Sequence, residues 1–130
     1  MGLAERRRIL ELQQTILPER ERELADICGR AIPYAVDWDT FADDAEALSL
    51  LEYSACHRVA MALRVVCRDA LGREAVREGL REVAIANVAD TSAMALTFEG
   101  GVLRLRGAWG QRSAGMFGDA EIGALLSARL

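Results

Sequence analysis

Cys56 and His57 are the one place in the sequence where a thiol adjoins an imidazole. A cysteine activated by a histidine is a common catalytic pair, and the same two residue types bind metals. Neighbours in a helix, however, point about 100° apart, so these two side chains cannot meet there. Cys67 shares a helix face with Cys56, but a helix rises roughly 16 Å over the eleven residues between them, which is too far for one metal ion. We therefore expect no catalytic residue, no metal site and no cofactor here, and we expect Cys28, Cys56 and Cys67 to be small core residues.

A second candidate site uses a carboxylate near the start of the same helix. Glu52, Tyr53, His57 and Arg64 form an alternative ligand site, which would lie between the sheet and the core helix. A buried Glu52 would have a raised pKa and could act as a general base. We favour two plainer interpretations over this ligand site. In the first, Glu52 is solvated and its negative charge is stabilised by the helix dipole. In the second, His57 and Arg64 pair with acidic or carbonyl groups elsewhere in the fold.

Two segments that contain aromatic residues are candidates for binding another protein. The first is an acidic stretch, residues 37–46, which lacks the central glycine and the twelfth-position glutamate of a calcium loop. The second, residues 107–118, is rich in glycine but has neither a phosphate-loop ending nor a dinucleotide-binding order of glycines. Its aromatic side chains are either lids over the core or exposed anchors. The tentative partner-binding residues are Trp38, Asp39, Phe41, Asp43, Trp109, Arg112, Met116 and Phe117.

One long buried helix, predicted over residues 44–71, must position both the Cys56 and His57 pair and the alternative site around Glu52. At 100° per residue, its apolar side chains, among them Leu48 and Leu63, cover a face far wider than a surface helix needs. Asp43 or Asp44 is suited to cap its first turn, and Gly72 is expected to end it. The remaining polar strip carries His57 and the arginines, so this helix is expected to form the centre of the core.

Shorter helices are predicted on both sides of this central one. Residues 3–16 form an amphipathic helix, and Pro18 suits the first turn of a second helix that ends at Gly29 in a left-handed cap. A single kinked helix across Pro18 is the competing interpretation. A short helix is expected over residues 73–80, and Asp119 can cap a last one.

Alternation of apolar and polar residues marks the strands. A first strand is expected between residues 32 and 38, and a second opens near Val83. The clearest signal is a hairpin over residues 94–106, with its turn at the glycines of residues 99–101. Arg104 and Arg106 fall on one face of it, so one side of the sheet should meet water. The chain is thus predicted to be α+β, with a long central helix and flanking helices packed on one face of a small, mainly antiparallel sheet.

Composition narrows the class of protein. The 130 residues suit one globular domain, residues 1–130, and the net charge of −4 with a pI near 5.1 argues against a general nucleic-acid binder. We expect no membrane span and no secretion signal, hence a cytoplasmic location, and an odd number of cysteines argues against a disulfide. The basic residues are all arginine, which is typical of a GC-rich bacterial genome.

Three hypotheses of function follow. The first is a small cytoplasmic protein-interaction module without catalytic activity, such as an adaptor, a chaperone or an inhibitor of the immunity-protein kind. The second is a small-molecule-binding protein or enzyme that uses Glu52, Tyr53 and His57. In the third, the amphipathic helix of residues 3–16 is an oligomerisation arm that pairs with a second copy to form a homodimer, although its apolar repeat is shorter than a coiled coil requires.

Overall fold

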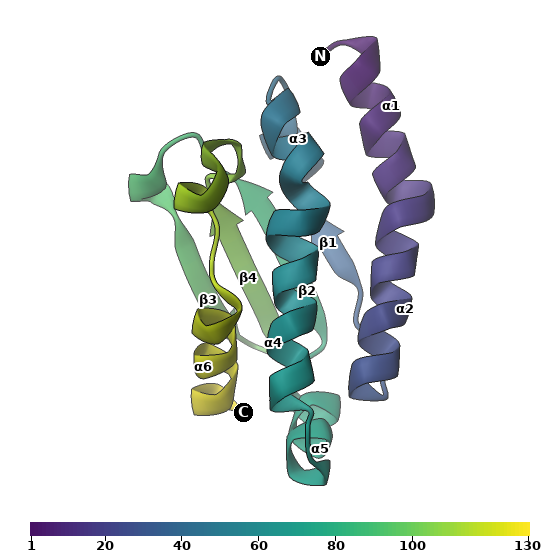
Figure 1. Ribbon diagram of the computed structural model, residues 1–130, viewed down its shortest axis with the longest axis vertical. Helices are drawn as coiled ribbons and strands as arrows, with labels where there is room; N and C mark the ends of the chain where they lie inside the picture. Colours follow the sequence, from purple (N-terminus) through teal and green to yellow (C-terminus); the bar gives the residue numbers. More distant parts are fainter.

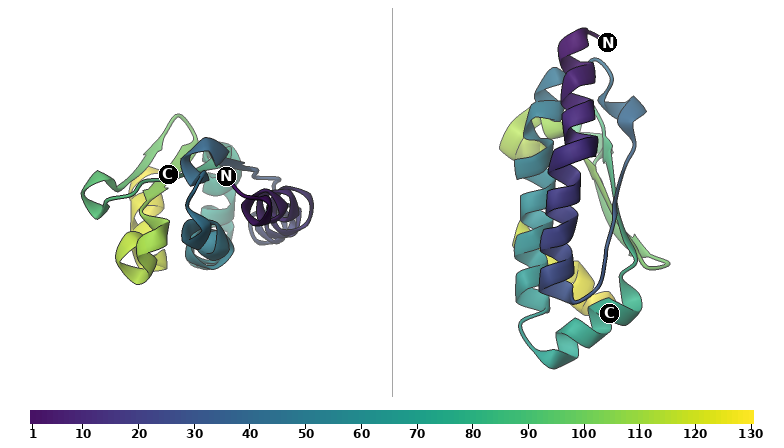
Figure 2. Two further views of the ribbon diagram at one scale, coloured as in Figure 1. Left: turned by 90° about the horizontal axis from the view of Figure 1, so that it is seen from above. Right: turned by 90° about the vertical axis from the view of Figure 1, so that its right-hand side faces the viewer.

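Two long helical rods lie side by side against one face of a four-stranded sheet, and a shorter helix, α6 (Asp119–Arg129), lies beside the second rod (Figure 1). The computed structural model describes all 130 residues. The helices cover only one face of the sheet, as the end-on and side views show (Figure 2). The fold is therefore α+β in two layers, with one sheet face left open.

The first rod runs without a break through Pro18. It consists of α1 (Leu3–Glu11), a π-helical segment η1 (Leu12–Ile16) and α2 (Leu17–Cys28). Proline has no N–H to donate and its ring crowds the carbonyl four residues back, so a wider π turn just before it lets the helix continue. The prediction of two separate helices is wrong here, and the competing interpretation is right in that one helix continues across Pro18. It ends as predicted at Gly29, whose φ of 72° is left-handed.

The second rod comprises α3 (Ala45–Leu51), a π-helical segment η3 (Glu52–His57) and α4 (Arg58–Val66). Its predicted cap is confirmed, because the Asp44 carboxylate accepts a hydrogen bond from the Ala47 N–H at 3.0 Å. The predicted end is wrong: the rod stops at Val66 instead of continuing to residue 71.

A sharp corner explains this early end and starts α5 (Ala70–Gly79). Asp69 caps α5 by accepting from the Gly72 N–H at 2.8 Å. A Cβ at Gly72 would lie 1.8 Å from the Val66 carbonyl oxygen, so only glycine allows the chain to fold back this tightly. Gly72 thus permits the corner from inside α5 and does not terminate the rod.

The sheet contains β1 (Tyr34–Val36), β2 (Glu82–Asn87), β3 (Ala95–Glu99) and β4 (Val102–Gly107), in the spatial order β1-β2-β4-β3. The predicted hairpin is confirmed, since β3 pairs with β4 antiparallel. The prediction of a mainly antiparallel sheet is wrong, because β1 with β2 and β2 with β4 are both parallel. Parallel neighbours need long crossover connections, and residues 37–81 provide one between β1 and β2.

The two faces of the sheet differ in the way the alternation predicts. Inward side chains such as Val83, Ile85 and Leu103 are fully or almost fully buried against the rods. Arg104 and Arg106 point outward and are exposed, so the prediction that one face meets water is confirmed. Ala84 and Ala86 line a shallow hollow beside them.

Short 3₁₀ segments complete the chain: η2 (Trp38–Phe41), η4 (Thr91–Ala93) and η5 (Trp109–Gly115). The helix α6 is capped by Gly118 without a side-chain hydrogen bond, so Asp119 lies in its first turn and is not the cap predicted from the sequence. None of the helices is both long enough and apolar enough to cross a membrane.

Candidate functional site

The acidic segment after β1 is divided between core and surface. Phe41 is fully buried, and Trp38 is half-buried with its ring centroid 6.4 Å from that of Phe41. Asp39 and Asp43 are exposed, and Asp43 has a φ of 63°. Of the predicted contact residues in this segment, the structure therefore leaves the two aspartates and part of Trp38 available to a partner.

The glycine-rich loop keeps its two aromatic side chains inside the protein. Trp109 is fully buried, its indole N–H donates to the Ala86 carbonyl at 2.8 Å, and its ring meets Phe117 edge to face at 6.3 Å. Met116 is half-buried against the core. Of the predicted contact residues in this loop, only Arg112 is exposed, and its guanidinium pairs with Glu46 at 2.7 Å. Trp109 and Phe117 are thus lids over the core and not exposed anchors.

Asn87, which the sequence analysis missed, ties these two segments together at the end of β2. Its side-chain amide donates to the Thr40 carbonyl at 3.1 Å and to the Asp44 carboxylate at 3.0 Å. Its side-chain oxygen accepts from the Trp109 N–H at 3.2 Å. The signal available in the sequence was an amide at an inward position of an alternating strand, two residues after Ile85. Because every polar atom of this side chain has a partner, the group is a structural junction.

The residues of the alternative ligand site do not converge. Tyr53 and His57 are both exposed, with their rings stacked at 5.5 Å on the outer side of η3. Glu52 points the other way, toward the first rod, where it pairs with Arg20 at 3.5 Å. Its side chain is 36% exposed and paired with Arg20, so Glu52 is half-buried, neither fully solvated as favoured nor enclosed as the alternative of a buried general base requires.

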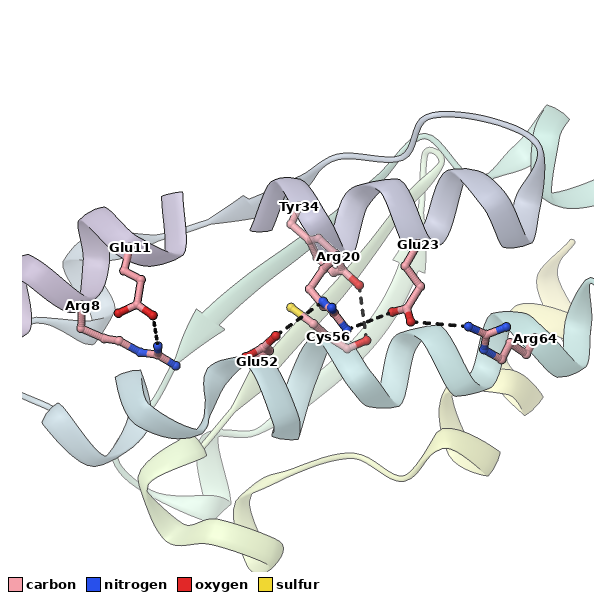
Figure 3. Close-up of polar contacts among 8 residues, drawn as sticks. All are labelled: Arg8, Glu11, Arg20, Glu23, Tyr34, Glu52, Cys56 and Arg64. Carbon is pink, nitrogen blue, oxygen red and sulfur yellow. Dashed lines mark hydrogen bonds and ion pairs between the residues drawn. The ribbon is translucent and has the colours of Figure 1, made fainter. Parts of the chain in front are cut away.

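Figure 3 shows that this pair belongs to a chain of charges between the rods. Arg20 also contacts Glu23 at 3.6 Å, and Glu23 contacts Arg64 at 3.4 Å. Beside them, the Tyr34 hydroxyl donates to the Cys56 carbonyl at 3.4 Å. Burial raises the pKa of the Tyr34 hydroxyl. The pair of Arg64 with Glu23 confirms, for this arginine, the favoured interpretation that the arginines pair with acidic groups.

The three cysteines are buried, as predicted for core residues. Burial is the main cause that raises the pKa of each thiol, to about 12 for Cys56. Protonated thiols are poor nucleophiles and poor metal ligands. No three side chains of the types His, Cys, Asp and Glu lie close enough together to hold a metal ion.

The largest hollow on the surface lies elsewhere, at the end of the molecule where α5, the β3–β4 turn and the end of α6 meet. We call it the α5 groove; its volume is about 680 Å³, and its lining residues are Leu71, Glu74, Ala75, Glu78, Gly79, Phe98, Glu99, Gly100, Gly101, Arg129 and Leu130. Residues 71, 74, 75 and 78 are spaced at three and four, so one face of α5 forms a whole wall. None of the sequence-predicted site residues lies in it.

The chemistry of the α5 groove combines an apolar surface with an acidic rim. Leu71 is 78% exposed, the highest value among the large apolar side chains, and Leu130 and Val65 extend the exposed apolar surface beside it. The rim carries the carboxylates of Glu74, Glu78 and Glu99, none of which forms an ion pair. Arg129 is the one cation among the lining residues. An apolar surface with unpaired carboxylates around it suits a ligand that is both apolar and basic.

Comparison of this chain with protein-family models, curated proteins and solved structures finds no match. The geometry of the α5 groove is therefore the observation from which a function can be argued.

Proposed function

We propose that this protein is a protein-interaction module that binds a basic, amphipathic segment of a polypeptide in the α5 groove. The observation that carries the proposal is the coincidence of the exposed Leu71 with the unpaired carboxylates of Glu74 and Glu78. In this proposal the chain binds in the cytoplasm as an adaptor or inhibitor and carries out no reaction of its own.

Burial of apolar surface supplies the affinity. Covering a side chain as exposed as Leu71 contributes about 1.5 to 3 kcal/mol, since roughly 25 cal/mol is gained per Å² of apolar surface removed from water. Leu130 and Val65 lie beside it and add to the covered area. The partner should therefore present at least two apolar side chains to this surface.

The carboxylates select the charge of the partner. Glu74 and Glu78 are one helical turn apart, so their like charges repel each other and destabilise α5 by a few tenths of a kcal/mol. A lysine or arginine of the partner placed between them removes this repulsion. An acidic segment of the same apolar content would add to it, so the groove discriminates by charge.

The residues predicted from the sequence have a secondary place in this proposal. Asp39, Asp43 and Arg112 are exposed and remain predicted contact residues. Asp43 lies just before α3, which begins at the end of the second rod opposite α5 (Figure 1).

The test is an NMR titration of the ¹⁵N-labelled protein with a helical peptide that carries leucines on one face and lysines beside them. We expect saturable shifts of the amide signals in α5 and in the turn at Gly100 and Gly101. The double variant Glu74→Gln/Glu78→Gln should weaken binding at least about tenfold, which corresponds to about 1.4 kcal/mol. Two matched controls are a peptide with glutamates in place of the lysines and the variant Glu19→Gln/Glu121→Gln. Shifts confined to residues outside the groove, or equal affinity for both peptides, would refute the proposal.

A further inference from the structure

The helix α1 has a second apolar stripe that faces away from the protein. Leu12 and Ile16, in the π turn that follows α1, face the core, whereas Leu3 and Leu10 are 57% and 50% exposed. Residues 3 and 10 are seven apart and so lie one above the other, two helical turns apart. No other part of the chain covers these two side chains.

The same stripe is basic. Arg6 and Arg7 lie between the two leucines, both are exposed, and neither forms an ion pair. The outer side of α1 is therefore a helix with apolar side chains and adjacent cations. This is the chemistry that the α5 groove is proposed to bind.

The stripe and the groove lie at opposite ends of the molecule. The N-terminus of α1 lies at the top of Figure 1 and α5 at the bottom. A chain cannot place its own α1 in its own groove without unfolding the first rod, whose inward residues belong to the core. Only another molecule can bring the two surfaces together.

We infer that the α5 groove of one molecule binds α1 of a second copy, so that molecules associate head to tail; this inference rests on the proposed function. In this arrangement Leu3 and Leu10 cover the apolar surface at Leu71, and Arg6 and Arg7 face Glu74 and Glu78. The charges that are unpaired within one chain then pair between two chains.

Electrostatics disfavours the symmetric alternative, in which the α1 helices of two copies pair with each other. A two-fold axis would bring the Arg6 and Arg7 cations of both copies close together, and like charges across an interface cost free energy. The head-to-tail contact is heterologous, so a pair of molecules keeps one free groove, on one molecule, and one free α1, on the other. Association can then continue into short chains of molecules.

The contact is small, so the association should be weak and reversible. One helix stripe against one groove covers less than the roughly 1,600 Å² of total surface that stable complexes bury. The pairing of exposed charges also makes it sensitive to salt, because the screening length falls below about 5 Å when the ionic strength exceeds about 0.4 M. We expect oligomers that grow with protein concentration and dissociate in high salt.

Complementary charge reversals test the inference on the full chain by sedimentation velocity over a range of concentrations. The variants Arg6→Glu/Arg7→Glu and Glu74→Arg/Glu78→Arg should each weaken self-association at least about tenfold. An equimolar mixture of the two should associate again. The acidic α1 of the first variant then meets the basic groove of the second, and the basic α1 of the second meets the acidic groove of the first. Two controls make the same changes of net charge at exposed residues outside both surfaces: Arg104→Glu/Arg106→Glu and Glu19→Arg/Glu121→Arg. Circular dichroism verifies that every variant is folded.

The outcomes separate this inference from the proposed function. If the wild-type protein stays monomeric at millimolar concentration while the basic peptide binds the groove, the head-to-tail inference fails and the proposed function stands. Loss of self-association in the Arg6 and Arg7 variant only, without restoration by the Glu74 and Glu78 variant, would show that α1 contacts a surface other than the groove and would also refute the inference. If neither the peptide nor a second copy occupies the groove, both proposals fail.

Discussion

The sulfur atoms of Cys28 and Cys67 lie 3.7 Å apart, although 39 positions separate the two residues in the sequence. Cys28 ends α2, and Cys67 follows the last residue of α4, so this contact joins the C-terminal ends of the two rods. Both thiols are buried. The sequence predicts both cysteines to be core residues, which their burial confirms, but no local pattern indicates their contact.

The buried thiols should react slowly in the native protein. Burial raises the pKa values of Cys28, Cys56 and Cys67, so the reactive thiolate is scarce near neutral pH. We expect the folded chain to react with an aromatic disulfide reagent at least about a hundredfold more slowly than the chain unfolded in guanidinium. Absorbance at a pH of about 8 measures both rates. One thiol equivalent released rapidly from the folded protein would contradict the prediction.

The 3.7 Å contact between the sulfur atoms of Cys28 and Cys67 predicts which disulfide can form. Prolonged treatment with diamide, which removes two hydrogens from a pair of thiols, should join Cys28 to Cys67 within one chain. Cys56 should stay reduced, since it lies eleven residues before Cys67 along the second rod, roughly 16 Å away, where its carbonyl accepts from Tyr34. Peptide mapping without reductant identifies the link. The variant Cys67→Ala should abolish it and Cys56→Ala should leave it unchanged.

Alkaline pH should destabilise the fold through Cys56. Burial, followed by the nearby charge of Glu52, raises the pKa of Cys56 to about 12 in the folded chain, above the ordinary value of 9.0. Between these values the unfolded chain has lost the proton and the folded chain keeps it. The contribution of Cys56 to the free energy of unfolding is therefore fully present below about pH 9. It declines as the pH rises toward 12, by up to about 1.4 kcal/mol per pH unit. Urea unfolding at several pH values should give a shallower decline for Cys56→Ala, and equal slopes would contradict this.

Replacement of Asn87 should be costly. Asn87→Ala removes the partner of Asp44, of the Thr40 carbonyl and of the Trp109 N–H together, and each buried polar group left without a partner costs about 1 to 3 kcal/mol. We expect a loss of about 2 to 4 kcal/mol in the free energy of unfolding. Asn87→Asp should also destabilise, with partial recovery in acid, because it sets a carboxylate against Asp44. Gln111→Ala, which removes an exposed hydrogen bond, is the control and should change stability by less than about 0.5 kcal/mol.

Two glycine-to-alanine substitutions should have opposite effects. A Cβ at Gly115 would lie 1.7 Å from the Ala108 carbonyl oxygen, so Gly115→Ala must displace the backbone under Trp109 and should cost about 3 kcal/mol. No atom within 4 Å would contact a Cβ at Gly123, which lies in α6. Gly123→Ala should stabilise by about 0.5 to 1 kcal/mol, since alanine favours a helix. Thermal unfolding of both variants tests the pair. Equal changes in the free energy of unfolding for Gly115→Ala and Gly123→Ala would contradict the prediction that the close approach at Gly115 requires glycine.

Local sequence determined the elements whose signals lie within a few residues of one another. Asp44 directly precedes the first turn of α3, which its side chain caps. Gly29 ends α2 because glycine readily adopts a left-handed conformation. The hairpin of β3 and β4 and the outward position of Arg104 follow from alternation around a glycine turn.

Only the tertiary structure decided what these elements meet. The alternation in β4 predicts β3 as one neighbour, but the insertion of β4 between β2 and β3 depends on how the whole sheet buries its inner face against the rods. The contact of Cys28 with Cys67 and the wall of the α5 groove depend in turn on the corner between Val66 and Ala70, which Gly72 permits from inside α5. Hydrophobic burial is non-directional, so a local pattern shows which face is buried but not which distant segment will cover it.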